Sequence, residues 1–139
     1  MAKVHSGHCL CGKVRFEATG DPLWVAHCHC ASCRRNTGSA VATFVGFRSA
    51  DFRYVQGAPK VYESSPGVLR GFCADCGTPL TYGGARAPGE THAYLGVMDD
   101  PAAYTPIAHV FTEEALPWLH IEDRAKRFAK TSRDGPPLA

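Results

Sequence analysis

Hydrophobic and polar positions alternate along short segments of the chain, and turn residues separate those segments. Val14, Phe16 and Ala18 occupy every second position of residues 13–18, so they share one face of an extended segment and predict a half-buried strand. The same alternation recurs in residues 51–55 and 60–63. We therefore expect short strands joined by turns.

Further apolar segments also indicate strands, and residues 40–47 are apolar enough to be buried on nearly both faces. The other predicted strands are residues 23–26, 78–82, 91–98 and 107–111. Short helical turns are expected from Ala31 to residues 36–39, and after Asp100, where Pro101 takes the first helical position. No amphipathic segment of about 10 to 15 residues lies between the strands, which favours an all-β domain over βαβ units.

Composition and charge limit the classes of protein to which this chain can belong. The chain has 139 residues, of which 45% are hydrophobic and 20% charged, as in an ordinary globular protein. We expect a single domain over residues 1–130 and a disordered tail over residues 131–139. No apolar run approaches the roughly 20 residues of a membrane helix, and the first residues lack the apolar core of a signal peptide. These features predict a cytoplasmic protein without a membrane partner, and a net charge of +2 gives no argument for a nucleic-acid partner.

Three cysteines lie within a six-residue segment, and two arginines follow them directly. These residues are Cys28, Cys30, Cys33, Arg34 and Arg35. A cytosolic chain keeps its thiols reduced, so seven cysteines argue for metal binding or catalysis rather than for disulfides. A zinc ion held by three thiolates lacks a fourth ligand, and an open position distinguishes a catalytic zinc from a structural one. The triplet is therefore the candidate catalytic site.

The remaining cysteines form a C-x-C pair and a C-x-x-C pair: Cys9, Cys11, Cys73 and Cys76. Four thiolates complete a structural zinc site, and a glycine directly after C-x-x-C is typical of a zinc knuckle. Such a site would link two distant segments and contribute strongly to folding. Spacing alone leaves other groupings open, such as Cys9 and Cys11 with two members of the triplet.

Histidines beside the cysteines are further candidates for nitrogen ligands: His8, His27 and His29. Neighbouring side chains on an extended segment point in opposite directions, which argues against each of them as a ligand. His29 could instead orient the thiolates or transfer a proton. The simpler interpretation is that His29 lies at the surface, or contacts the metal ligands without binding the metal itself.

The ordered motifs G-x-C-x-C-G, C-H-C-x-x-C-R-R and F-C-x-x-C-G resemble the glutathione-dependent formaldehyde-activating enzyme family, which also includes centromere protein V. The resemblance covers about residues 5–128 and extends to His109 and Trp118, which look like core or pocket-wall residues. It implies stacked, twisted antiparallel sheets, sometimes called a β-tent, and two zinc ions per chain. The structural zinc would take Cys9, Cys11, Cys73 and Cys76, and the catalytic zinc would take Cys28, Cys30 and Cys33.

The resemblance also implies a carbon–sulfur lyase that adds a thiol, typically glutathione, to formaldehyde or another small aldehyde. A thiol at the open position of zinc is deprotonated and can attack the aldehyde carbonyl to give an S-hydroxyalkyl thiol. Glutathione carries two carboxylates, so Arg34 and Arg35 are candidates to bind it through paired hydrogen bonds, with Arg70 as a further candidate. The alternative for each arginine is an ordinary solvated side chain.

Two other classes of function compete with the lyase. A thiol-redox enzyme could use C-x-x-C, although four thiols held by a structural ion would leave it only the triplet. A zinc-stabilised binding module without catalytic activity is the second alternative, and the basic residues between Arg124 and Lys130 are its only candidate for nucleic-acid binding.

Overall fold

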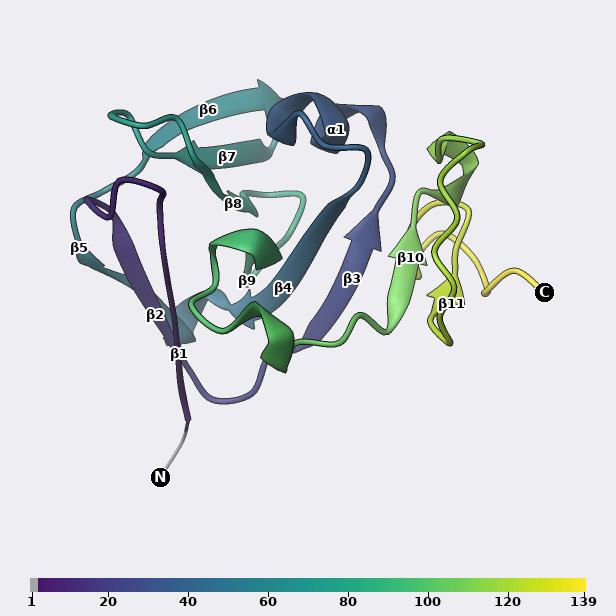
Figure 1. Ribbon diagram of the computed structural model, residues 1–139, viewed down its shortest axis with the longest axis horizontal. Helices are drawn as coiled ribbons and strands as arrows, with labels where there is room; N and C mark the ends of the chain where they lie inside the picture. Colours follow the sequence, from purple (N-terminus) through teal and green to yellow (C-terminus); the bar gives the residue numbers. More distant parts are fainter. Residues whose placement is uncertain (1–2) are drawn as a thin grey trace. The chain divides into compact units, whose positions relative to one another are not determined.

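The computed structural model describes residues 3–139 and confirms the all-β class, with strands dominating and one short α-helix (Figure 1). Contacts divide the chain into two compact units, and each is described by itself. The first unit comprises Met1–Leu23 and Val45–Tyr104, and the second comprises Trp24–Phe44 and Thr105–Ala139. The single domain expected over residues 1–130 stays a prediction.

The first unit contains a three-stranded antiparallel sheet in the order β1-β2-β5. Its strands are β1 (Val4–His8), β2 (Arg15–Thr19) and β5 (Phe52–Gln56). The alternation predicted around β2 is confirmed, because Phe16 is fully buried and its ring stacks on that of Phe52 at 4.8 Å. Strand β1 was not predicted, since its sequence is mostly polar and contains a glycine.

The same unit contains four antiparallel strands in the order β9-β8-β7-β6. They are β6 (Lys60–Ser65), β7 (Val68–Phe72), β8 (Pro79–Gly83) and β9 (Glu90–Tyr94). The strand predicted over residues 91–98 ends early, because the chain turns into a 3-10 helix at Leu95–Val97.

Two strands of the fold show what alternation alone can and cannot predict. Every residue of β6 is exposed, so its alternating pattern does not mark a buried face there. The boundary between the two units falls within β4 (Ala42–Arg48), which is buried at every position except Thr43 and Arg48. The prediction that this apolar strand is buried on nearly both faces is therefore confirmed.

The second unit is built on three strands in the order β11-β10-β3. They are β3 (Trp24–Cys28), β10 (Ala108–Val110) and β11 (Lys126–Arg127), and β10 pairs in parallel with both neighbours. This parallel pairing departs from the antiparallel pairs β1-β2-β5 and β6-β7-β8-β9 of the first unit. The disorder expected for residues 131–139 stays a prediction; within them, the Leu138 N–H donates to the Arg127 carbonyl at 2.7 Å.

The helix α1 (Ala31–Thr37) follows β3 directly and begins and ends at the predicted positions. Cys30 is its N-cap, and the Sγ of this residue accepts a hydrogen bond from the Cys33 N–H at 3.3 Å. Gly38 ends the helix with a φ of 71°, a conformation that glycine adopts without strain. The cysteine triplet is thus carried by one strand end and one helical turn. Among the described residues, no helix has the length and hydrophobicity needed to span a membrane.

Candidate functional site

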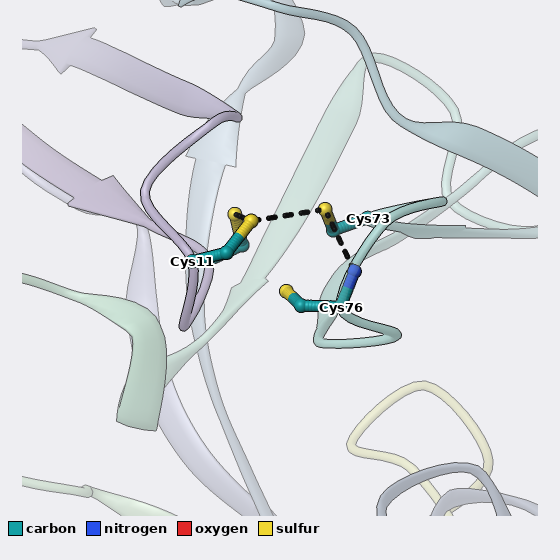
Figure 2. A group of neighbouring side chains, drawn as sticks. Cys11, Cys73 and Cys76 are labelled. Atoms are coloured by element: carbon teal, nitrogen blue, oxygen red, sulfur yellow. Dashed lines mark hydrogen bonds between the residues drawn. The ribbon is translucent and has the colours of Figure 1, made fainter.

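A cluster of four cysteines lies between two loops of the first unit. The loop after β1 supplies Cys9 and Cys11, and the loop after β7 supplies Cys73 and Cys76. The sulfurs of Cys9 and Cys11 are 3.5 Å apart, and those of Cys11 and Cys73 are 3.8 Å apart. Figure 2 shows the side chains of Cys11, Cys73 and Cys76 pointing toward one another from the two loops. All four sulfurs lie within 4.8 Å of one another.

These residues fit a tetrahedral zinc ion. Zinc–sulfur bonds of about 2.3 Å in a tetrahedron place the sulfurs about 3.8 Å apart, close to the spacing observed here. Two sulfurs also accept backbone hydrogen bonds, from the Val14 N–H to Cys9 at 3.3 Å and from the Cys76 N–H to Cys73 at 3.5 Å. Such bonds stabilise thiolates, which are the form that binds metal. Gly77 follows with a φ of 77°, as the knuckle pattern predicts.

The pKa values of the thiols in this cluster also indicate that it needs a bound cation. A hydrogen bond from the Thr78 hydroxyl, with further bonds to backbone N–H groups, lowers the pKa of Cys76 to about 5. The Lys13 N–H favours the thiolate of Cys11, but burial and the neighbouring thiols outweigh it and raise the pKa of Cys11 to about 12. Four thiols this close cannot all ionise without a compensating positive charge, which a divalent metal supplies.

The second cluster is the predicted triplet. Cys28 ends β3, Cys30 caps α1 and Cys33 lies in its first turn, so one strand-to-helix junction brings their sulfurs within 4.8 Å of one another. Hydrogen bonds with Cys30 and Cys33, together with burial, raise the pKa of Cys28. Among residues 3–139 no fourth cysteine, histidine or carboxylate joins this group. The three sulfurs could hold a zinc ion and leave one position for a substrate.

The cysteines therefore group as four and three, and all seven are free thiols in the described chain. The alternative grouping of Cys9 and Cys11 with members of the triplet does not occur in the structure. The roles of these cysteines as metal ligands remain predictions.

The three candidate histidines join neither cysteine cluster. The Nδ1 of His8 lies 2.6 Å from Asp99 Oδ1, and the Nδ1 of His27 lies 2.7 Å from Thr43 Oγ1. The Nε2 of His29 instead lies 2.9 Å from the Nδ1 of His109.

The His29 contact belongs to a chain of hydrogen bonds that the sequence did not reveal. His109 is 2% exposed, and its Nε2 lies 2.7 Å from Asp123 Oδ2. Burial opposes ionisation of Asp123, but hydrogen bonds from His109 and Arg127 outweigh it and lower the pKa of this carboxyl to about 2. Burial, followed by the nearby His109, lowers the pKa of His29 to about 4. No motif marks Asp123, which resembles any surface carboxylate in the sequence.

His27, His109 and Asp123 also form a group with metal-ligating atoms within 4.8 Å. The Nη1 of Arg127 donates to Asp123 Oδ1 at 2.5 Å, so a guanidinium already neutralises this carboxylate. A second cation beside the guanidinium would be repelled, which makes this group a poor metal site.

The candidate substrate-binding arginines differ in their surroundings. Arg34 donates from Nη1 to the carbonyls of His29 and Glu114, at 2.5 and 2.6 Å, and so braces the junction that carries the triplet. Arg35 is exposed on α1, and its guanidinium makes no hydrogen bond within the described residues. Arg70 is buried and donates to Ser64 Oγ and the Tyr94 hydroxyl. These bonds give Arg70 a role in holding the fold together.

Two residues near the end of the resemblance also differ from each other. His109 is buried, as predicted, but Trp118 is 66% exposed. The prediction of a core or pocket-wall role for Trp118 is therefore wrong, because the segment after β10 leaves most of its surface in solvent.

Comparison with known proteins agrees with the motifs. The sequence model of the family described as "Glutathione-dependent formaldehyde-activating enzyme" matches residues 4–114. The chain is also similar to a Rhodobacter sphaeroides protein of known crystal structure, with 26% identity and a TM-score of 0.57. That similarity covers 68% of this chain and 87% of the other. A search of curated proteins gives no match. This chain belongs to the glutathione-dependent formaldehyde-activating enzyme family.

Proposed function

We propose that this family member is a zinc-dependent carbon–sulfur lyase that reversibly adds a thiol, glutathione in the first instance, to formaldehyde or another small aldehyde. The observation that carries the proposal is the division of the cysteines into a set of four and a set of three, each with its sulfurs within 4.8 Å. The set of four, Cys9, Cys11, Cys73 and Cys76, completes the coordination of a structural zinc. The set of three, Cys28, Cys30 and Cys33, leaves one position for chemistry.

Zinc bound by the triplet would supply a thiolate nucleophile at neutral pH by lowering the pKa of a thiol that occupies its open position. The protein's own part is to hold three sulfurs in place. Cys30 is held by the hydrogen bond that its Sγ accepts from the Cys33 N–H, and Arg34 ties the same turn to the carbonyls of His29 and Glu114. The triplet is therefore preorganised by the backbone of one junction.

Arg35 is the better of the two candidates for binding a carboxylate of glutathione. It is exposed on α1, two residues after Cys33, and its guanidinium makes no hydrogen bond within residues 3–139. Both bonds described for Arg34 go to backbone carbonyls, so engaging a substrate would compete with its bracing role. A guanidinium that is free of partners can form two parallel hydrogen bonds to a carboxylate.

Two-dimensional exchange NMR on equilibrated glutathione and formaldehyde tests the proposal, because it measures the rate of adduct formation and breakdown at equilibrium. We expect zinc-loaded protein to accelerate the exchange and Cys30→Ser protein not to do so. Serine is an effective N-cap residue, so its hydroxyl can accept the Cys33 N–H and preserve α1 while the thiolate ligand is lost. The variant thus separates loss of the metal ligand from loss of the helix.

Zinc analysis of the same samples makes the result decisive. Wild-type protein should contain two zinc ions per chain and the Cys30→Ser variant one. Protein that holds two zinc ions but leaves the exchange rate unchanged would refute the lyase for these substrates and favour the zinc-stabilised binding module. Rapid reaction of the triplet with a thiol reagent, without a chelator, would favour the redox alternative instead.

A further inference from the structure

The junction between β3 and α1, residues 28–31, lies beside a segment that is distant in the sequence. This segment comprises residues 110–114, which end β10 and continue through the 3-10 helix Thr112–Glu114. Parallel pairing of β10 with β3 places Val110 opposite Cys28. The segment therefore runs next to the backbone that carries the cysteine triplet, within the second unit.

The three peptide units of the junction are held by hydrogen bonds one by one. The His29 N–H donates to the Val110 carbonyl at 3.1 Å, and the His29 carbonyl accepts from Arg34 Nη1 at 2.5 Å. The last unit donates the Ala31 N–H to Glu114 Oε1 at 3.1 Å. The backbone that spaces the sulfurs of the triplet is thus fixed by bonds from outside the helix as well as within it.

Glu114 takes part in this arrangement twice. Its carboxylate accepts from the Ala31 N–H, and its carbonyl accepts from Arg34 Nη1 at 2.6 Å. Ala31 is the first residue of α1, and the first N–H groups of a helix have no acceptor inside the helix. The Cys33 N–H of this turn is bound by the Sγ of its N-cap, Cys30. Glu114 supplies the acceptor that the Ala31 N–H needs.

Glu114 is itself held in place by the turn that precedes it. Phe111 adopts a φ of 54° and a ψ of 41°, which is an uncommon conformation for a bulky residue. Its N–H donates to the Lys130 carbonyl at 2.8 Å, and its carbonyl accepts from the Glu114 N–H at 3.0 Å. A strained backbone conformation persists only where the surrounding contacts determine it. The contacts of Phe111 therefore define where the Glu114 side chain begins.

The preceding residue, Glu113, provides a natural comparison. Glu113 and Glu114 are both exposed, and both lie on the 3-10 helix Thr112–Glu114. Within residues 3–139 the carboxylate of Glu113 makes no hydrogen bond, whereas that of Glu114 binds the junction. The two side chains carry the same charge, so they separate the effect of the hydrogen bond from the effect of a nearby carboxylate.

We propose that Glu114 is a positioning residue for the triplet. Its carboxylate fixes the peptide between Cys30 and Ala31, and this fixes the Sγ of Cys30 relative to the Sγ of Cys33. The three sulfurs are thereby held in the tetrahedral arrangement that a zinc ion requires. The inference rests on the proposed function, because it concerns the metal site of the proposed lyase. Glu114 acts through the backbone and needs no contact with substrate.

Cadmium-loaded protein studied by ¹¹³Cd NMR tests this role, because cadmium also binds thiolates and the two cysteine clusters should give separate signals. We expect Glu114→Ala to shift the signal of the triplet. Competition with a chelator should show that this variant binds cadmium at the triplet about tenfold more weakly, as is typical for changes around the ligands of a metal. The signal of the set of four should stay unchanged, which also shows that the variant is folded.

Two matched variants show whether the hydrogen bond is the cause. Glu114→Gln keeps an acceptor oxygen for the Ala31 N–H, so its affinity for cadmium at the triplet should stay within about threefold of wild type. Glu113→Ala removes the same charge without removing the bond, and it should leave the triplet unchanged. An unchanged triplet in the Glu114→Ala protein would overturn the proposal. A loss in either matched variant as large as that in Glu114→Ala would overturn it as well.

Hydrogen exchange of the Ala31 amide gives a readout that needs no metal in the triplet. We expect this amide to exchange about tenfold faster in the Glu114→Ala protein, and at nearly the wild-type rate in the Glu114→Gln protein. If the triplet binds no metal or does not accelerate thiol exchange, the proposed function fails, and this measurement still decides whether Glu114 holds the junction. Equal exchange of the Ala31 amide in all three proteins would overturn the proposal.

Discussion

Replacing Cys76 by serine should remove the proposed structural zinc and show how much of the stability of the fold depends on it. The cluster joins Cys11 to Cys73, which are 62 residues apart in the sequence. A cross-link that closes a loop of this length stabilises the folded chain by about 4 kcal/mol through the lost entropy of the unfolded state. Domains are stable by only about 5–15 kcal/mol, so the loss is a large part of the total. For a chain of this size it corresponds to a fall in Tm of about 12 °C.

Thermal unfolding followed by circular dichroism, with zinc measured in the same samples, tests this expectation. Cys30→Ser is the matched control, because it removes a proposed ligand from a cluster confined to residues 28–33 and therefore opens only a short loop. We expect both variants to lose one zinc ion per chain, but only Cys76→Ser to show most of the expected 12 °C fall in Tm. A Cys76→Ser protein with full zinc content, or with an unchanged Tm after losing zinc, would refute the reasoning.

Three further results are expected. Arg35→Ala should raise the glutathione concentration for half-saturation severalfold, since one charge-assisted bond contributes about 1.5–3 kcal/mol before solvent screening. Arg124→Ala, at another exposed arginine, is the control. Unchanged saturation of the Arg35→Ala protein would reject a role for Arg35 in binding glutathione. The carboxyl of Asp123, whose pKa is lowered to about 2, should stay ionised as the pH falls from 7 to 3. Its contribution to the stability of the fold is therefore complete above about pH 4 and is lost toward pH 2. A carboxyl ¹³C signal of Asp123 that titrates near pH 4 would contradict this expectation. Gly7→Ala should destabilise the first unit by about 1–3 kcal/mol, because the added Cβ would lie 2.4 Å from the Phe16 ring and 2.6 Å from the Val97 carbonyl oxygen. Gly96→Ala, which meets no atom within 4 Å, should have little effect on the unfolding midpoint in urea.

Local patterns were enough to predict the triplet and the helix that carries it. Cys28, Cys30 and Cys33 are close in the sequence, so one strand end and one helical turn can bring their sulfurs together whatever the rest of the chain does. The strands around β2 and β4 were predicted for the same reason, since the period of the hydrophobic side chains is a local property. Gly38 and Gly77 likewise mark turns that require a positive φ.

Counting the cysteines made the set of four a natural hypothesis, but the sequence left other groupings open. Cys9 and Cys11 meet Cys73 and Cys76 only because β1 and β7 place two distant loops side by side within the first unit. That contact depends on strand order, which alternation does not specify. Tertiary structure decided the grouping.

Burial and long-range hydrogen bonds were also beyond the sequence. Alternation shows which residues of β6 share a face, but whether another layer covers that face depends on the rest of the fold, and here β6 is exposed throughout. Asp123 is hydrogen-bonded to His109, which lies 14 positions away in the sequence, and His109 is hydrogen-bonded to His29, which lies 80 positions away. The sequence by itself therefore determined the all-β class, the family motifs and the local geometry of the triplet. Tertiary structure alone decided which side chains are covered and which distant polar groups meet, because both depend on contacts between segments that share no sequence pattern.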